Sequence, residues 1–377
     1  MGRAGPRHLV IDARTVRPGA TGVGHCVAGW LRGVNAVLPK TPEWRVSAWR
    51  LVKGTEGGDG VWCELENIDI VETGVDYEQH PQGDWWLQRH SNDWMRRLSG
   101  DVLLSPAFIG PWRRRSFKRL LVVPDAIAWQ NPENYPKAFG AYLRKATAWS
   151  ARQADRLLTL SPASAAQIRN TEFGRKLRPR LLPCGYDPGV FHPAESRPEN
   201  SRPVIIYTAS FEPRKNHDVL FEALRHEQVA LLKPKLVLLH RATESEIADV
   251  KRRAGRIDVE VVTPKSSQDI ADWTRRANLA VFPSRNEGFG IPALEAMASG
   301  IPLVASRIGA MEWLTEDGEC AALVDPDDVA RWARAIRRVL DGSGDVEHRR
   351  RLALGRARQF TWSHAAEQLL AHAAEVV

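Results

Sequence analysis

The sequence predicts an α/β protein built from two doubly wound domains that face a cleft. Short apolar runs typical of strands alternate with helical segments over both halves of the 377 residues. A polar, proline-containing stretch at 195–203 separates the two halves, as a linker does. A chain of this length can bury the cores of two ordinary domains.

The first half begins with an expected strand at His8–Ile11, a glycine loop, and a helix from about His25 to Leu38. The loop could approach a ligand closely, although it lacks the G-x-G-x-x-G dinucleotide pattern. It could equally be a turn that lets the helix pack. Gly22, Val23 and Gly24 are the candidate residues of this loop. Further strands are expected at 44–52, 68–72, 102–105, 120–123 and 155–161.

Two segments of the first half have more than one interpretation. Trp85, Trp86 and Trp94 lie at helical spacing, which is typical of a core, but aromatic residues also suit a site that accepts sugars or lipids. The segment 111–119 contains five basic residues with Trp112 and Phe117 among them. It is expected to be a solvated basic loop, or else a contact with an anionic acceptor or a membrane surface.

The second half opens with a strand at Val204–Ala209, followed by a loop and a helix from about His217 to Leu224. The loop contains the adjacent cations Arg214 and Lys215. An arginine can hold a diphosphate in a fork and a lysine can act as a point charge, although two solvated basic residues would give the same pattern.

The most informative stretch is 279–306, where an apolar strand, a glycine turn, a helix and a second strand follow one another. Gly288 and Gly290 form the turn, Pro292 suits the first turn of the helix, and Gly300 suits its end. A glycine turn that enters a helix leaves backbone N–H groups that attract phosphate. Glu287 opens the turn. Glu295 is expected in the first helical turn, where it could bind sugar hydroxyls or only complement the helix dipole.

This stretch, EGFGIPALEAMASGIPLVAS from Glu287 to Ser306, resembles the signature of retaining GT-B glycosyltransferases of family four, also called glycosyl transferases group 1. The resemblance is strong from 204 to 340 and weaker before residue 120. It implies two Rossmann-like domains, with a C-terminal helix from Thr361 that crosses back to the first. The implied domains are 1–195, which binds acceptor and is completed by 361–377, and 200–360, which binds the nucleotide sugar.

The resemblance also implies a role for individual residues. Glu287 would contact the donor sugar, Glu295 the ribose, and Lys215 the phosphates. The implied catalytic residues are Glu287, Asp125 and Lys215. The implied donor-binding residues are Arg214, Lys215, Glu287, Gly288, Phe289, Gly290, Ile291 and Glu295. The first glycine loop also resembles the start of this family, which implies an acceptor or cleft-facing role for Gly22, Val23 and Gly24.

The sequence departs from the family pattern at two positions. Pro124 stands where the family usually has a histidine near the donor sugar, and proline has neither an ionisable side chain nor an N–H group. Ser210 stands where the family has an earlier arginine, and Arg214 could supply the missing charge. The first departure keeps open a second interpretation, a protein that binds nucleotide sugars without transferring them.

Composition restricts the remaining possibilities. The four cysteines are far apart in sequence, which argues against a zinc site and a disulfide framework. The net charge of +8 indicates an anionic partner or a mildly basic surface, and no nucleic-acid-binding motif is visible. No signal core or membrane-spanning run is apparent, so we expect a cytoplasmic protein, soluble or peripheral to the inner face of a membrane.

The expected function is that of a hexosyltransferase. The chain would move a sugar from a GDP- or UDP-linked donor to an acceptor hydroxyl with retention at the anomeric carbon, in polysaccharide, glycolipid or other glycoconjugate synthesis. The only D-x-D sequence, Asp325-Pro326-Asp327, is expected to begin a helix, so we expect neither a metal nor a cofactor. The expected acceptor is a glycan, a lipid-linked molecule or a small molecule.

Overall fold

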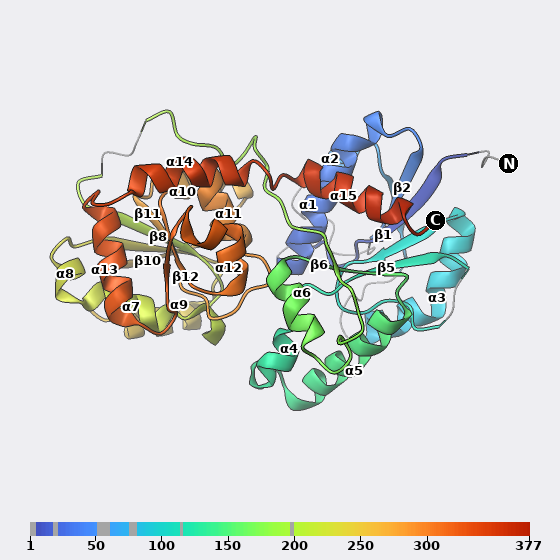
Figure 1. The fold of residues 1–377 in the computed structure, drawn as a ribbon, viewed down its shortest axis with the longest axis horizontal. Helices are drawn as coiled ribbons and strands as arrows, with labels where there is room; N and C mark the ends of the chain where they lie inside the picture. The colour runs from blue at the N-terminus through green and yellow to red at the C-terminus, as the bar shows by residue number, and fades with distance from the viewer. Residues whose placement is uncertain (1–4, 18–21, 51–60, 75–80, 114–115, 197–199) are drawn as a thin grey trace. The chain divides into compact units, whose positions relative to one another are not determined.

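The computed structural model describes residues 5–17, 22–50, 61–74, 81–113, 116–196 and 200–377 (Figure 1). The chain forms two compact units, 1–185 with 362–377, and 186–361. The first unit ends at Gly185, ten residues before position 195, at which the sequence predicted the end of the first domain. The reason is that the Tyr186 N–H donates to the Phe360 carbonyl at 3.0 Å, which ties this segment to the end of the second unit.

The first unit contains a sheet of seven parallel strands in the order β3-β2-β1-β4-β5-β6-β7. The central strands β1 and β4 are almost completely buried, as expected for a parallel sheet covered on both faces. The strands are β1 (Arg7–Asp12), β2 (Trp44–Arg50), β3 (Asp69–Glu72), β4 (Val102–Ser105), β5 (Lys118–Val122), β6 (Arg156–Thr159) and β7 (Arg180–Leu181).

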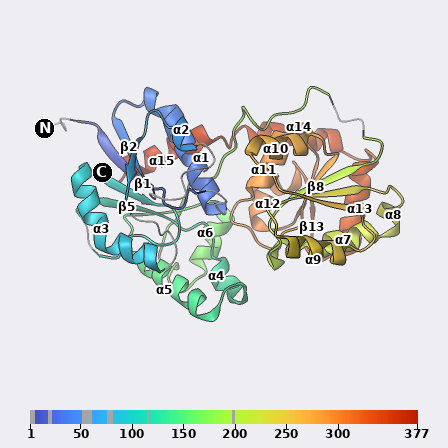
Figure 2. The same ribbon diagram turned by 180° about the vertical axis from the view of Figure 1, so that it is seen from behind.

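Helices lie on both faces of this sheet (Figures 1 and 2). The α-helices described are α1 (Gly22–Val37), α2 (Val61–Glu64), α3 (Gln82–Leu98), α4 (Ile127–Gln130), α5 (Lys137–Gln153), α6 (Pro162–Arg169) and α15 (Trp362–Ala374). Short 3-10 turns lie at Leu38–Lys40 and Pro132–Asn134. Ser161 caps α6, because its Oγ accepts the Ser164 N–H at 3.1 Å.

The C-terminal helix α15 belongs to the first unit and packs on α1, which confirms the expected crossing back. Gly29 and Gly33 make this packing close. A Cβ atom on Gly33 would lie 2.0 Å from the Trp362 carbonyl oxygen, so only glycine fits there. Helix α1 begins at Gly22, earlier than the sequence indicated. Gly22, Val23 and Gly24 therefore form its first turn and are not a loop, and the preceding residues 18–21 lie outside the described residues.

The second unit contains six parallel strands in the order β10-β9-β8-β11-β12-β13. They are β8 (Val204–Thr208), β9 (Lys235–Leu239), β10 (Val259–Val262), β11 (Leu279–Phe282), β12 (Leu303–Ser306) and β13 (Ala322–Val324). The helices are α7 (His217–Arg225), α8 (Glu227–Ala230), α9 (Glu244–Ala254), α10 (Ser267–Arg275), α11 (Ile291–Ala298), α12 (Gly309–Leu314), α13 (Val329–Leu340) and α14 (Val346–Ala357). Short 3-10 turns lie at Pro213–Lys215 and Glu316–Gly318.

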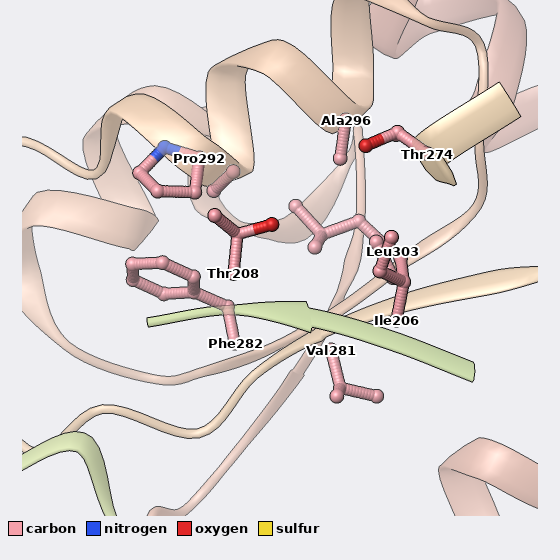
Figure 3. A pocket seen from close by; sticks show the side chains of 10 residues that line it. Ile206, Thr208, Thr274, Val281, Phe282, Pro292, Ala296 and Leu303 are labelled. Carbon is pink, nitrogen blue, oxygen red and sulfur yellow. The ribbon is translucent and has the colours of Figure 1, made fainter. Parts of the chain in front are cut away.

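A small cavity of about 10 Å³ lies between this sheet and helix α11, and it has room for about one water molecule. Its walls are mainly apolar, with Thr208 and Leu303 on the strands and Pro292 and Ala296 on the helix (Figure 3). No charged side chain lines it. The cavity is therefore a packing gap under α11.

Candidate functional site

The candidate site lies at the carboxyl ends of β8 and β11, which are neighbouring parallel strands with Leu279 opposite Ile205. The chain leaves β8 into a loop that ends in the 3-10 turn Pro213–Lys215. It leaves β11 into the segment 283–290, which leads to α11. Because both strands end at the same edge of the sheet, the two loops meet there, and this edge is where parallel sheets bind ligands.

The Glu287 carboxylate forms ion pairs with two cations of the opposite loop. Lys215 Nζ lies 2.6 Å from Glu287 Oε1, and an Arg214 guanidinium nitrogen lies 3.2 Å from the same oxygen. The Lys215 and Glu287 side chains are 11% and 10% exposed, so the pair is largely shielded from water. A shielded pair with two cations on one carboxylate fixes the positions of the charges before any ligand arrives.

A second carboxylate, which the sequence analysis did not single out, holds Arg214 from the other side. Glu212 Oε2 accepts a hydrogen bond from Arg214 Nε at 2.8 Å, and Glu212 Oε1 accepts one from Ser210 Oγ at 2.8 Å. Burial alone would raise the pKa of Glu212, but the Arg214 charge and the Ser210 hydrogen bond lower it below its ordinary value. Glu212 is therefore ionised at neutral pH and orients the guanidinium.

Backbone contacts join the two loops. The Arg285 N–H donates to the Arg214 carbonyl at 2.8 Å, and the Arg214 guanidinium donates to the Asn286 carbonyl at 3.3 Å. The buried Tyr207 hydroxyl donates to the Lys215 carbonyl at 2.9 Å and lies 3.2 Å from Ser284 Oγ. These bonds order the backbone beneath the charged side chains.

The glycine turn enters α11 in a left-handed conformation. Gly290 has φ +104° and caps the helix, and its carbonyl accepts the Ala293 N–H at 3.0 Å. A Cβ atom at Gly290 would lie 2.3 Å from Met311 Cε. Pro292 lies in the first turn, and Gly300 follows the helix with φ +68°. These features confirm the strand, turn and helix predicted for this stretch.

Phe289 anchors the turn in an aromatic cluster. Its side chain is 2% exposed, and its ring centroid lies 5.8 Å from those of Trp313 and Phe360, edge to face in each case. The guanidinium carbon of Arg356 lies 4.8 Å from the Phe360 ring centroid. Since Phe289 points into this cluster, its side chain serves to hold the turn.

The prediction that Glu295 lies in the first turn of α11 is wrong. The helix begins at Ile291, so Glu295 is its fifth residue and belongs to the second turn. It is 6% exposed. A glutamate in that position does not serve to complement the helix dipole, because that effect falls off within the first turn.

Other candidate residues lie in the first unit. Asp125 Oδ1 accepts the Ile127 N–H at 3.0 Å at the start of α4. Pro124 before it is buried, and its carbonyl lies 3.5 Å from Thr159 Oγ1. The D-x-D segment lies just before α13 and does not form its first turn as expected, because the helix begins at Val329. Asp328, which follows the segment, caps the helix by accepting the Arg331 N–H on Oδ1 at 2.9 Å, and Asp327 pairs with Arg285.

The tryptophan and basic segments divide between core and surface. Trp86 is buried against Trp49, as a core residue would be, whereas Trp85 is 57% exposed. In the segment 111–119, Phe117 is buried and Arg119 pairs with Asp155. Arg114 and Arg115 lie outside the described residues.

Residues 202–342 match the family model for glycosyl transferases group 1. The match covers 141 of the 377 residues. It includes both loops of the candidate site, from β8 through α11.

Two curated relatives match over part of the chain. A "D-inositol 3-phosphate glycosyltransferase" of Nocardioides sp. is 31% identical over 58% of this chain and 53% of its own length. An "MMP alpha-(1->4)-mannosyltransferase" of Mycolicibacterium hassiacum is 35% identical over 59% of this chain and 54% of its own length. The chain thus spans about half the length of these relatives in each match.

Solved structures match over nearly the whole chain. A sucrose-phosphate synthase from Thermosynechococcus elongatus has a TM-score of 0.78 at 19% identity, covering 98% of this chain and 99% of its own. Anabaena HepE in complex with UDP and glucose has a TM-score of 0.72 at 15% identity, covering 98% and 100%. The two parallel sheets with their helices are those of the GT-B fold.

Proposed function

We propose that the chain transfers a sugar from a nucleotide-diphosphate sugar, linked to UDP or GDP, to an acceptor hydroxyl with retention at the anomeric carbon. The observation that carries this proposal is the Lys215–Glu287 ion pair, 2.6 Å long, beside the glycine turn that leads into α11. It places a cation, a carboxylate and helix-start N–H groups at one edge of the sheet, where phosphate and sugar hydroxyls of one ligand could both be bound.

Each group has a proposed task in the transfer. Arg214, Lys215 and the backbone from Gly288 to Gly290 would stabilise the diphosphate as negative charge develops on the leaving oxygen. Glu287 would accept hydrogen bonds from hydroxyls of the donor sugar, and Glu295 from those of the ribose. We propose Ile291 as a further donor contact, and a reaction that needs neither a metal nor a cofactor.

The first unit is proposed to serve the acceptor, with Asp125 as a catalytic residue and Gly22, Val23 and Gly24 as acceptor contacts. The relatives include a protein named as an inositol 3-phosphate glycosyltransferase and one named as a mannosyltransferase, and the HepE structure contains UDP and glucose. These names support a nucleotide-sugar donor. The acceptor is proposed to be a glycan, a lipid-linked molecule or a small molecule.

A donor-turnover assay tests this function. The protein is incubated with UDP- and GDP-hexoses, with and without a panel of acceptor sugars, and the released nucleotide is measured. We expect release with one donor, a loss of at least 100-fold in Glu287→Gln, and no loss in Asp327→Asn, whose side chain is exposed. NMR of the product anomer tests retention. No release with any donor, or equal release by Glu287→Gln, would contradict the proposal.

A second function, binding of nucleotide sugars without transfer, is favoured by one observation. Pro124 is buried and carries no group that could act as an acid, a base or a hydrogen bond donor at that position. Saturable donor binding without nucleotide release in any acceptor mixture would favour this second function over the first.

A further inference from the structure

The net positive charge of the protein comes entirely from the first unit. Residues 1–185 with 362–377 contain 27 Lys and Arg against 19 Asp and Glu, whereas residues 186–361 contain 26 of each. The unit with the candidate phosphate loop is therefore neutral overall. The surplus of +8 cannot be explained by donor binding at that loop, and it indicates a separate anionic partner.

The surplus is densest between Arg89 and Arg180, where 18 Lys and Arg face only six Asp and Glu. This segment includes most of α3 and all of α5. Among the described residues, the large apolar side chains left exposed include Trp85, 57% exposed on α3, and Trp149, 54% exposed on α5. Both lie within or beside the basic segment.

Helical spacing groups these aromatics with cations. Arg89 lies one turn after Trp85 on α3, and Lys145 and Arg152 lie one turn before and after Trp149 on α5. All of these side chains are exposed, as is Arg113 in the loop between β4 and β5. We call this set the aromatic–basic face: Trp85, Arg89, Arg113, Lys145, Trp149 and Arg152.

Contacts between α3 and α5 hold the face together. The two helices approach each other near the start of α3, where Tyr142 of α5 donates to Asp84 of α3 at 2.6 Å. Trp112 bridges them, because its ring lies 6.0 Å from that of Trp85 and its Nε1–H donates to Ser150 Oγ, next to Trp149, at 3.0 Å. The exposed indoles are thus mounted on fixed neighbouring elements.

We propose that the aromatic–basic face binds the surface of an anionic lipid bilayer. Arginine and lysine side chains are attracted to anionic headgroups, and tryptophan rings favour the headgroup region because they are apolar with one polar N–H. The face offers both side-chain types together, as interfacial binding requires. No helix in the described ranges is long and apolar enough to span a bilayer, so the contact is made by side chains on the surface.

Vesicle sedimentation of the full chain without donor or acceptor tests this inference independently of the proposed function. The vesicles contain either phosphatidylcholine alone or 30% phosphatidylglycerol. We expect binding to the anionic vesicles only, weakened by salt. Lys145→Ser/Arg152→Ser should weaken it about 25-fold, at about fivefold per cation. Trp85→Ala/Trp149→Ala should weaken binding to the anionic vesicles about tenfold. The same variant should also lose the residual vesicle binding that the wild type keeps at high salt.

Matched controls come from the neutral unit. Arg334→Ser/Arg338→Ser removes two exposed cations of α13, and Leu231→Ala removes an exposed apolar side chain, 72% exposed. Neither should change vesicle binding. The Lys145/Arg152, Arg334/Arg338 and Leu231 variants should unfold at the wild-type temperature because the changed side chains are exposed. The Trp85/Trp149 variant also loses the ring contact with Trp112, so its unfolding temperature should fall slightly while it stays folded in the assay. Absence of vesicle binding, or equal binding by the Lys145/Arg152 and Arg334/Arg338 variants, would overturn the inference. So would binding to a soluble polyanion such as heparin without binding to vesicles.

Discussion

Lys215 and Glu287 are 72 residues apart in sequence, yet Lys215 Nζ and Glu287 Oε1 lie 2.6 Å apart where β8 and β11 end side by side. The pair is largely shielded from water, and Arg214 approaches the same carboxylate oxygen at 3.2 Å. The two loops of the candidate site are therefore joined electrostatically as well as through their backbones. This relationship has consequences for stability and for ligand binding.

Replacing Lys215 should destabilise the second unit. In Lys215→Ala, Glu287 keeps only the longer Arg214 contact, and removing one partner of a shielded ion pair costs about 3 kcal/mol. Chemical denaturation of wild type and variant measures this loss. The control is Arg285→Ala, because the Arg285–Asp327 pair has side chains 49% and 66% exposed and contributes less than about 1 kcal/mol. Equal losses in the two variants would show that Glu287 does not depend on Lys215.

Gly290→Ala should deform the glycine turn. Its φ of +104° is costly for a residue with a side chain, and the new Cβ would lie 2.3 Å from Met311 Cε. We expect a loss of about 1–3 kcal/mol in unfolding free energy, measured by denaturation. Gly355→Ala is the matched control. Gly355 lies inside α14 with open space around it, so the same change should stabilise by about 0.5–1 kcal/mol. Loss of stability in Gly355→Ala, or none in Gly290→Ala, would contradict this assignment.

The stability of the second unit should decrease in acid partly through His217. Its ring packs against Tyr207 and Phe211, and its buried Nε2 has no hydrogen bond partner. The pKa of His217 is lowered to about 3. Burial is the main cause, and the nearby Arg253 charge adds to it and outweighs the opposite effect of the Asp218 charge. The unfolded chain, with an ordinary histidine pKa near 6.5, binds the proton more readily. Stability therefore falls as the pH falls from about 6.5 toward 3.

The His217→Phe variant should remove this part of the acid sensitivity. Between pH 6 and 4 we expect its unfolding free energy to fall less steeply than that of the wild type, by about 1.4 kcal/mol per pH unit. Denaturation at a series of pH values provides the measurement, with the exposed His348→Phe as reference variant. The pKa values of His8, His240 and His372 are also lowered by burial, so some acid sensitivity should remain. Equal pH slopes for His217→Phe and wild type would refute this prediction.

Thiol reactivity should distinguish one cysteine from the other three. Cys63 is exposed, whereas Cys26, Cys184 and Cys320 are buried. Burial raises the pKa of Cys184, and it raises that of Cys320 to about 11. An aromatic disulfide reagent should therefore modify one thiol quickly in the native protein and four after denaturation. Cys63→Ser should abolish the fast reaction, and a fast reaction that persisted in this variant would show that a buried thiol is accessible.

The sequence predicted best what is encoded locally. In the stretch 279–306, Gly290 and Pro292 mark the start of the helix and Gly300 marks its end. The structure places β11, α11 and β12 within this stretch as expected. Glu295 was placed one turn too early because the exact start of a helix depends on the conformation of the preceding residue, here the left-handed Gly290.

Contacts between distant segments could not be predicted in the same way. The contact of the Tyr207 hydroxyl with Ser284 Oγ and the backbone bond from Arg285 to Arg214 depend on the pairing of β8 with β11, which a single sequence does not reveal. The cysteines show the same limit. Cys26 and Cys184 are 158 residues apart, yet their Sγ atoms lie 3.2 Å apart as free thiols in the first unit. Separation in sequence therefore did not exclude contact.

Calorimetric titration of the wild-type protein with UDP, GDP and their hexose conjugates tests the central claim most directly. We predict that one nucleotide sugar binds and raises the unfolding temperature. Glu295→Ala and Lys215→Ala should each weaken that binding at least tenfold, while the exposed Asp327→Asn should leave it unchanged. If no nucleotide binds, or if the Glu295 and Lys215 variants bind as tightly as the wild type, the edge of β8 and β11 is not a donor site.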